Sequence, residues 1–102
     1  MAIYKNITGG SPPVTTTLIN KNSSRVLSIN KILITNHDDS DNCVVKIQLN
    51  NEAGSPTIYV INETDIPARA SLVLEDNLSF DIKTYSLEAV TSTTADITII
   101  IT

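Results

Sequence analysis

The stretch CVVKIQLN, residues 43–50, decides the fold because its side chains alternate between apolar and polar. Successive side chains of an extended chain point to opposite sides, so this period of two predicts a strand with one buried face. Each large aliphatic side chain on that face contributes roughly 1.5–3 kcal/mol when buried. A slip of one residue would bury Lys46 and Gln48 instead, so the register of this strand is firmly set. The apolar side comprises Cys43, Val45, Ile47 and Leu49.

The same period recurs elsewhere, whereas no segment keeps an apolar period of 3.6 residues. LSFDIKTY (78–85) alternates, and so does ADITIIIT (95–102), where Ile100 points away from its isoleucine neighbours and could touch a partner from an edge strand. Short connections rich in Gly, Pro, Asn, Asp and Ser separate these segments. We predict strands near residues 2–7, 14–20, 25–36, 43–50, 57–62, 70–75, 78–84, 86–91 and 96–102.

Regular short strands with tight connections are typical of antiparallel sandwiches and barrels. We therefore predict an all-β chain that forms a single antiparallel β-sandwich or jelly-roll-like barrel of about eight short strands. The 102 residues favour one domain, residues 1–102. Residues 1–13 are the exception, because TGGSPP (8–13) supplies flexible glycines and prolines without an N–H. This stretch predicts a joint, before which the first strand either folds back on its own domain or reaches a neighbouring subunit as an N-terminal arm.

RVLSINKILITN, residues 25–36, changes its apolar phase part-way along. Leu27 and Ile29 share one parity, whereas Ile32 and Ile34 share the other. One extra residue near positions 30–31 would reconcile the two halves, and a β-bulge is such an insertion. A strand that is apolar on both faces at its end is the alternative, and the sequence leaves both open.

Charge and the lengths of the apolar runs exclude several classes of protein. The formal net charge is −4 and the seven basic residues are scattered, which argues against a nucleic-acid binder. An acidic surface can still meet a basic patch on a protein partner. No apolar run approaches the roughly 18 residues of a membrane helix, and the first ten residues lack the apolar core of a signal peptide. We therefore expect synthesis and folding in a cytoplasm.

The only histidine, His37, lies among aspartates in HDDSDN, residues 37–42. Cys43 is the nearest nucleophile, but its inward phase predicts a buried, inert thiol. The loop also resembles a Ca²⁺ loop, with Asp38, Asp39 and Asp41 as candidate ligands. It lacks the glycine and the distal glutamate of an EF-hand loop, so we expect a solvated turn and no metal.

Glu75, Asp76 and Asp81 form a second acidic group, and paired carboxylates can hydrolyse glycosides. A binding cleft would also carry aromatic side chains, which make up only 4% of this chain. A Gly-rich phosphate loop, a CxxC pair and a nucleophile elbow are all absent from the sequence. We therefore expect no enzyme, no catalytic residue and no cofactor.

Two longer stretches carry a resemblance to a known family. IPARASLVLEDNLSFDIKTYS (66–86) combines an Ile-Pro-Ala step, an apolar strand, an acidic turn and LSFDIK, and KILITNHDDSDNCVVKIQL (31–49) precedes it. Residues 25–90 thereby resemble small β-sandwich virion structural proteins of tailed bacteriophages, the capsid decoration or cement-like proteins. In that family an SI-x-I-x-N strand, an IPA-x-x-SL-x-L segment and an L-x-x-GD-x-I strand recur. Residues 28–36, 66–74 and 78–82 match these in outline, but Phe80 stands where the family has glycine, so the bend expected there should be absent.

The resemblance implies a non-enzymatic structural protein of a bacteriophage particle, made in the host cytoplasm and located in the virion. Such a protein decorates or cements the capsid by binding the major capsid protein and neighbouring copies of itself. A tail, neck or fibre component is the first alternative, and a small β-module that binds carbohydrate or Ca²⁺ is the second. Ile3, Tyr4 and Ile7 of the arm are the predicted partner contacts, because a short uncoupled strand gains stability by pairing with a neighbour.

Overall fold

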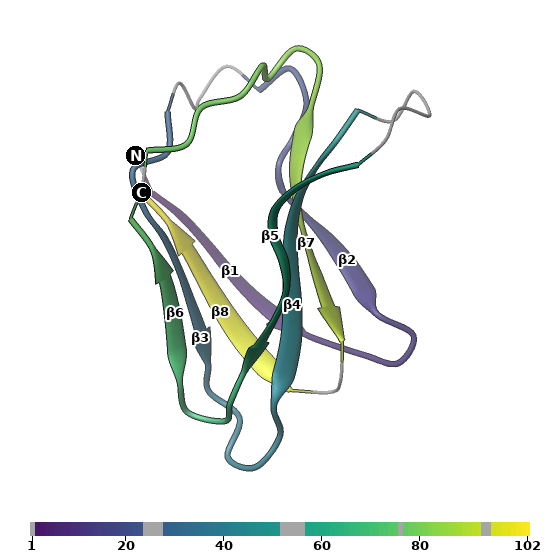
Figure 1. Ribbon diagram of the computed structural model, residues 1–102, viewed down its shortest axis with the longest axis vertical. Helices are drawn as coiled ribbons and strands as arrows, with labels where there is room; N and C mark the ends of the chain where they lie inside the picture. The colour runs from purple at the N-terminus through teal and green to yellow at the C-terminus, as the bar shows by residue number, and fades with distance from the viewer. Residues whose placement is uncertain (1, 24–27, 52–56, 76, 93–94) are drawn as a thin grey trace.

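The chain folds into two four-stranded antiparallel sheets that lie face to face (Figure 1). The computed structural model describes residues 2–23, 28–51, 57–75, 77–92 and 95–102. One sheet has the strand order β1-β8-β3-β6 and the other β2-β7-β4-β5, so the predicted β-sandwich is confirmed. The strands are β1 (Ile3–Thr8), β2 (Val14–Ile19), β3 (Ile32–Asn36), β4 (Cys43–Asn50), β5 (Ile58–Ile66), β6 (Ser71–Leu74), β7 (Ser86–Ser92) and β8 (Asp96–Ile101).

The strand pairing is that of one long hairpin rolled into two layers. β1 pairs with β8, β2 with β7, β3 with β6 and β4 with β5, all antiparallel. The nesting is visible in the register, since Ile3 lies opposite Ile101 at the open end and Cys43 opposite Ile66 near the closed end. β3–β8 and β4–β7 pairs then complete each sheet. This arrangement is a jelly roll, one of the two forms that the sequence predicted.

Alternating side chains explain the core between the sheets. In β4 the odd positions are buried and the even positions are half-buried, as the sequence predicted. In β8 the same alternation places Ile99 in the core and Ile100 on the outer face. Among the described residues, no helix is long and apolar enough to cross a membrane. The largest fully enclosed apolar side chains are Ile29, Ile32, Ile34, Ile47, Leu87, Ile97 and Ile99.

The predicted strand over residues 78–84 is wrong. Only Leu78 makes a bridge, to Ile29, and the chain then turns. Asp81 makes the turn: its carboxylate accepts hydrogen bonds from the Lys83 amide (3.0 Å) and the Thr84 hydroxyl (2.6 Å). An aspartate that bonds its own downstream backbone competes with strand pairing. The expectation that Phe80 would remove the bend is also wrong, because Asp81 makes the bend without a glycine.

The change of apolar phase within residues 25–36 is reconciled by a bulge. The successive amides of Asn30 and Lys31 both donate to the carbonyl of Thr102, at 2.8 and 3.1 Å. Two residues opposite one is the pattern of a β-bulge, which allows Ile29 and Ile32 to be buried together. Leu27 lies outside the described residues, and the regular strand β3 starts later than predicted, at Ile32.

β5 continues past its predicted end at residue 62 as far as Ile66. Its polar NETD segment hid this extension, because edge strands can carry polar side chains on both sides. The β5 register against β4 shifts twice, and Glu63 has a positive φ of 53°. The shift turns the Glu63 carboxylate toward Lys46 of β4, where the two form a 3.3 Å ion pair.

Candidate functional site

An apolar row crosses the outer face of the β1-β8-β3-β6 sheet. The register sets Tyr4 of β1 beside Ile100 of β8, Ile100 beside Leu33 of β3, and Leu33 beside Val73 of β6. Tyr4 and Val73, at the two ends of the row, are 68% and 43% exposed, and the two central side chains are half-buried. We call these four residues the apolar row.

A polar row lies directly beside it on the same face. It consists of Asn6, Thr98, Thr35 and Ser71, again one residue from each strand. The Thr98 hydroxyl donates to Asn6 Oδ1 at 2.7 Å, and the Thr35 and Ser71 hydroxyls lie 3.0 Å apart. The two rows together form an uncharged face of eight residues, whose polar groups are paired within the sheet. Exposed Asp96 lies beside it in the next row, where its carboxylate accepts a 2.7 Å hydrogen bond from the Thr8 hydroxyl.

The outer face of the β2-β7-β4-β5 sheet is different, because it is charged. Lys46 pairs with Glu63 and lies 5.7 Å from the centroid of the Tyr59 ring. Glu88 of β7 is buried, and its carboxylate accepts a 2.9 Å hydrogen bond from Gln48 Nε2. This face also carries a shallow hollow of about 80 Å³, which is far below the roughly 300–1,000 Å³ of a small-molecule pocket.

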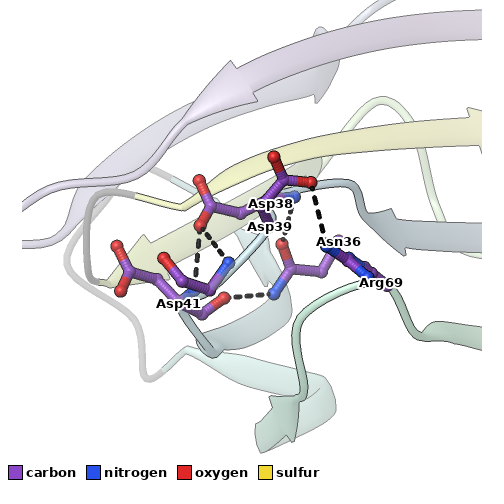
Figure 2. A network of polar contacts seen from close by, with 6 residues as sticks. Asn36, Asp38, Asp39, Asp41 and Arg69 are labelled. Carbon is purple, nitrogen blue, oxygen red and sulfur yellow. Dashed lines mark hydrogen bonds and ion pairs between the residues drawn. The ribbon is translucent and has the colours of Figure 1, made fainter.

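The acidic loop between β3 and β4 is organised by a buried asparagine (Figure 2). Asn36 is fully enclosed, and its Nδ2 donates to the carbonyls of Asp41 (2.8 Å) and Ile66 (2.9 Å). Its Oδ1 accepts the amide of Asp38 at 3.0 Å. Asn36 therefore joins the start of the loop, the end of the loop and the end of β5.

The three candidate metal ligands in this loop make different contacts. Asp38 Oδ2 accepts the amides of Ser40 (3.1 Å) and Asp41 (2.8 Å), as Figure 2 shows. These backbone hydrogen bonds, that of Asp41 foremost, hold the pKa of Asp38 below its ordinary value. Asp39 instead lies 3.6 Å from Arg69 in an exposed ion pair. Within the described ranges, no three acidic, histidine or cysteine side chains are grouped to hold a metal.

We predict that Ca²⁺ leaves the melting temperature unchanged, since the Asp38 carboxylate already binds backbone amides. Melts by circular dichroism with Ca²⁺ and with a chelator should coincide. Ligand binding to the folded state raises the melting temperature by mass action, so a Ca²⁺-dependent rise would contradict this prediction. Loss of that rise in an Asp38→Asn variant would then assign the site to this loop.

Two aspartates should contribute to the loss of folding stability at low pH. The Thr84 hydroxyl, followed by the Lys83 amide, lowers the pKa of Asp81, as the Asp41 and Ser40 amides do for Asp38. A lowered pKa in the folded state adds stability above the unfolded-state pKa, and that stability is lost as pH falls through the folded value.

The wild type should therefore lose stability from about pH 4 downward. A variant with Asp38→Asn and Asp81→Asn should show a flatter dependence of melting temperature on pH in that range. Asp39→Asn is the matched control, because Asp39 makes an ion pair rather than backbone hydrogen bonds. Identical acid limbs for the wild type and the double variant would refute this assignment.

The side chains considered for catalysis are not assembled into a site. Cys43 is fully buried with its Sγ 3.2 Å from the carbonyl of Ser92, whereas His37 is exposed. The inward orientation predicted for Cys43 is thus confirmed. Of the second acidic group, Glu75 is exposed, Asp81 is used in its turn, and Asp76 lies outside the described residues.

Burial predicts that Cys43 reacts with a thiol reagent only after denaturation. Absorbance of a thiol-reactive chromophore should stay flat in buffer and rise to one equivalent per chain in denaturant. Rapid labelling of the native protein would show that the strand opens or that the thiol faces solvent.

Side chains alternate between the two faces of β1, so the three predicted partner contacts do not all lie on the same face. Residues 3–8 pair with β8 of the same chain, so of the two alternatives the segment folds back as a strand of its own sandwich. Ile7 is 6% exposed and packs in the core, which corrects its assignment as a contact. Ile3 is half-buried against the core, and Tyr4 alone of the three is largely exposed.

Sequence reasoning missed Leu33 and Val73, the two other members of the apolar row besides Tyr4 and Ile100. An available signal was the second apolar parity within ILI (32–34) and LVL (72–74), where a residue between two inward side chains must point outward. Which of those outward residues are neighbours follows only from the sheet register.

Comparison with known proteins finds structures with a similar fold but assigns the chain to no family. No protein-family model and no curated protein matches the chain. It is similar to structures of infectious bursal disease virus: the T13 viral particle (TM-score 0.58) and the Gx strain (TM-score 0.52), each at 14% identity. Both matches cover 99% of this chain and 30% of the other, so the chain spans about a third of their length. It also resembles an Anabaena sensory rhodopsin transducer, with a TM-score of 0.46, 13% identity, and coverage of 98% and 94%. At these identities the likeness shows the fold alone.

Proposed function

We propose that the chain is a non-enzymatic structural protein of a bacteriophage particle. It decorates or cements the capsid by binding the major capsid protein and neighbouring copies of itself. The observation that carries this proposal is the uncharged face, where a row of four apolar side chains crosses all four strands beside a row of four paired polar ones. Flat, packed surfaces of this kind suit contact between proteins rather than binding of a small molecule.

Two further points support the proposal. The sequence resemblance to capsid decoration proteins covers residues 25–90, which supply β3, β4, β5, β6 and most of β7. The jelly roll is also a fold used by viral capsid domains.

The test is the amount of this chain on purified phage particles whose genome encodes it. Quantitative mass spectrometry should find it in a fixed ratio to the major capsid protein, and tail-less capsids should retain it. Retention on isolated tails alone would favour the tail, neck or fibre alternative. Complete absence from particles would overturn the structural role and leave a free binding module.

A further inference from the structure

We propose that Lys5 prevents the edge strand β1 from pairing with a strand of a second copy of this chain. This role goes beyond the proposed function, because it names a contact between copies that the fold excludes. It depends on the chain alone, so it can be tested in solution.

β1 is the sheet edge whose backbone is most open to strand addition. An edge strand leaves a row of N–H and C=O groups with which a strand of another chain can pair. All six residues of β1 keep an unbroken register against β8, and the strand contains no proline. Ile3, Tyr4 and Ile7 are also residue types that favour strands. The backbone of β1 therefore presents a regular template for another strand.

The edges formed by β2, β5 and β6 are protected by their backbones. β5 shifts its register twice against β4, and Glu63 within it has a positive φ of 53°. β2 follows two prolines and shifts its register between Thr17 and Ile19, and β6 is only four residues long. Short strands, prolines and bulges are common means of keeping sheet edges from pairing. β1 has none of these, so its protection has to come from a side chain.

Lys5 lies on the inward-pointing side of β1. Its register partner is Ile99, which has no exposed surface, and directly opposite residues of an antiparallel pair share a face. Ile3 and Ile7, two positions away on either side, are half-buried and buried, whereas Lys5 is exposed. Its ammonium group therefore leaves the core side past the open edge of the sheet. Among the described residues Lys5 makes no ion pair or side-chain hydrogen bond that would explain its position.

An added strand would close this route to water. It would cover the edge beside Lys5 and enclose an ammonium group without a partner, which is unfavourable. Neither β2 nor β6 of a second copy offers an acidic side chain to pair with it.

Pairing of β1 with β1 of a second copy meets the same obstacle. The antiparallel register that sets Ile3 opposite Ile7 also sets the two Lys5 side chains opposite each other. Like charges directly opposite one another destabilise a strand pair. A shift of two residues in either direction sets Lys5 opposite an isoleucine and leaves its charge unpaired. Lys5 therefore disfavours every one of these registers.

Four variants test this role. Lys5→Ile removes the charge and completes an inward row of three isoleucines, whereas Lys5→Thr removes the charge without a large apolar side chain. Lys5→Glu keeps a charge at the edge but reverses its sign. Lys83→Ile is the matched control, because Lys83 is exposed in a turn and belongs to no strand. Sedimentation velocity over a concentration series reaching ~1 mM measures association, and melting temperatures show whether each variant is folded.

Lys5→Ile should associate at least about tenfold more tightly than the wild type, and Lys5→Thr should change in the same direction. Lys5→Ile takes the formal net charge from −4 to −5, so general repulsion between copies acts against this result. Lys5→Glu and Lys83→Ile should associate no more than the wild type. In the Lys5→Ile assembly, amide hydrogen exchange should show new protection of the β1 amides that face away from β8.

A Lys5→Ile variant that associates no more than the wild type would overturn the inference. Equal association of Lys83→Ile would assign the effect to added apolar surface at any position. Association of Lys5→Glu to the extent of Lys5→Ile would show that a charge here does not block the edge, and unprotected β1 amides in the assembly would place the contact elsewhere. Recovery of the chain with particles is a separate measurement, so each of these results leaves the proposed function intact.

Discussion

An Asn36→Ala variant is expected to lose about 3 kcal/mol of unfolding free energy. The substitution leaves the carbonyl of Ile66 without its partner in a buried site, and an unpaired buried group costs about 1–3 kcal/mol. It also removes the part-buried hydrogen bonds to the carbonyl of Asp41 and from the amide of Asp38, which adds a smaller loss. Urea denaturation followed by circular dichroism measures the change. Asn6→Ala is the control, because the exposed Asn6 side chain accepts one hydrogen bond at the surface.

A second substitution at the same position separates hydrogen bonding from packing. Asn36→Asp keeps the shape of the side chain and the acceptor for Asp38, but it turns a carboxylate oxygen toward two carbonyls in place of the donating amide. We expect it to be at least as destabilising as alanine, since an unpaired buried charge is costly. If Asn36→Asp were as stable as the wild type, the network would not hold the loop.

An Ile99→Ala variant is expected to lose about 2–5 kcal/mol, because Ile99 has no exposed surface and truncation leaves a cavity between the sheets. A domain of this size has a total of only about 5–15 kcal/mol, so the loss is a large fraction of its free energy of unfolding. Ile100→Ala, one residue further along, is the matched control.

Ile100 points outward, so its truncation should cost less than about 1 kcal/mol in the same urea titration. Equal destabilisation by the two substitutions would mean that the alternation of β8 does not separate core from surface.

The sequence predicted those elements in which local pattern and tertiary environment agree. β4 and β8 alternate without interruption, and both are strands whose inward side chains were identified in advance. Residues 78–84 alternate equally well, yet the hydrogen bonds of Asp81 make them a turn. Side-chain bonding of this kind does not alter the hydrophobic period, so periodicity alone could not reveal it.

The candidate site was harder to predict, because it depends on contacts between distant segments. Tyr4, Leu33, Val73 and Ile100 come from four different strands, and only the register brings them into one row. Asn36 ends an apolar strand and looks like a turn residue, and its partner Ile66 lies thirty residues further on. Its role as a structural link could not be inferred from its neighbours in sequence.

The position of β8 in its sheet has a consequence for biosynthesis. β8, shown in yellow in Figure 1, lies between β1 and β3. It is the last of the described strands to leave the ribosome. β1, made first, has no partner in its own sheet until then. The β4–β5 hairpin can form early, whereas the sheet that carries the uncharged face closes only when β8 arrives. During translation the nascent chain therefore exposes unpaired strand edges, and a stall before Asp96 would yield an aggregation-prone species.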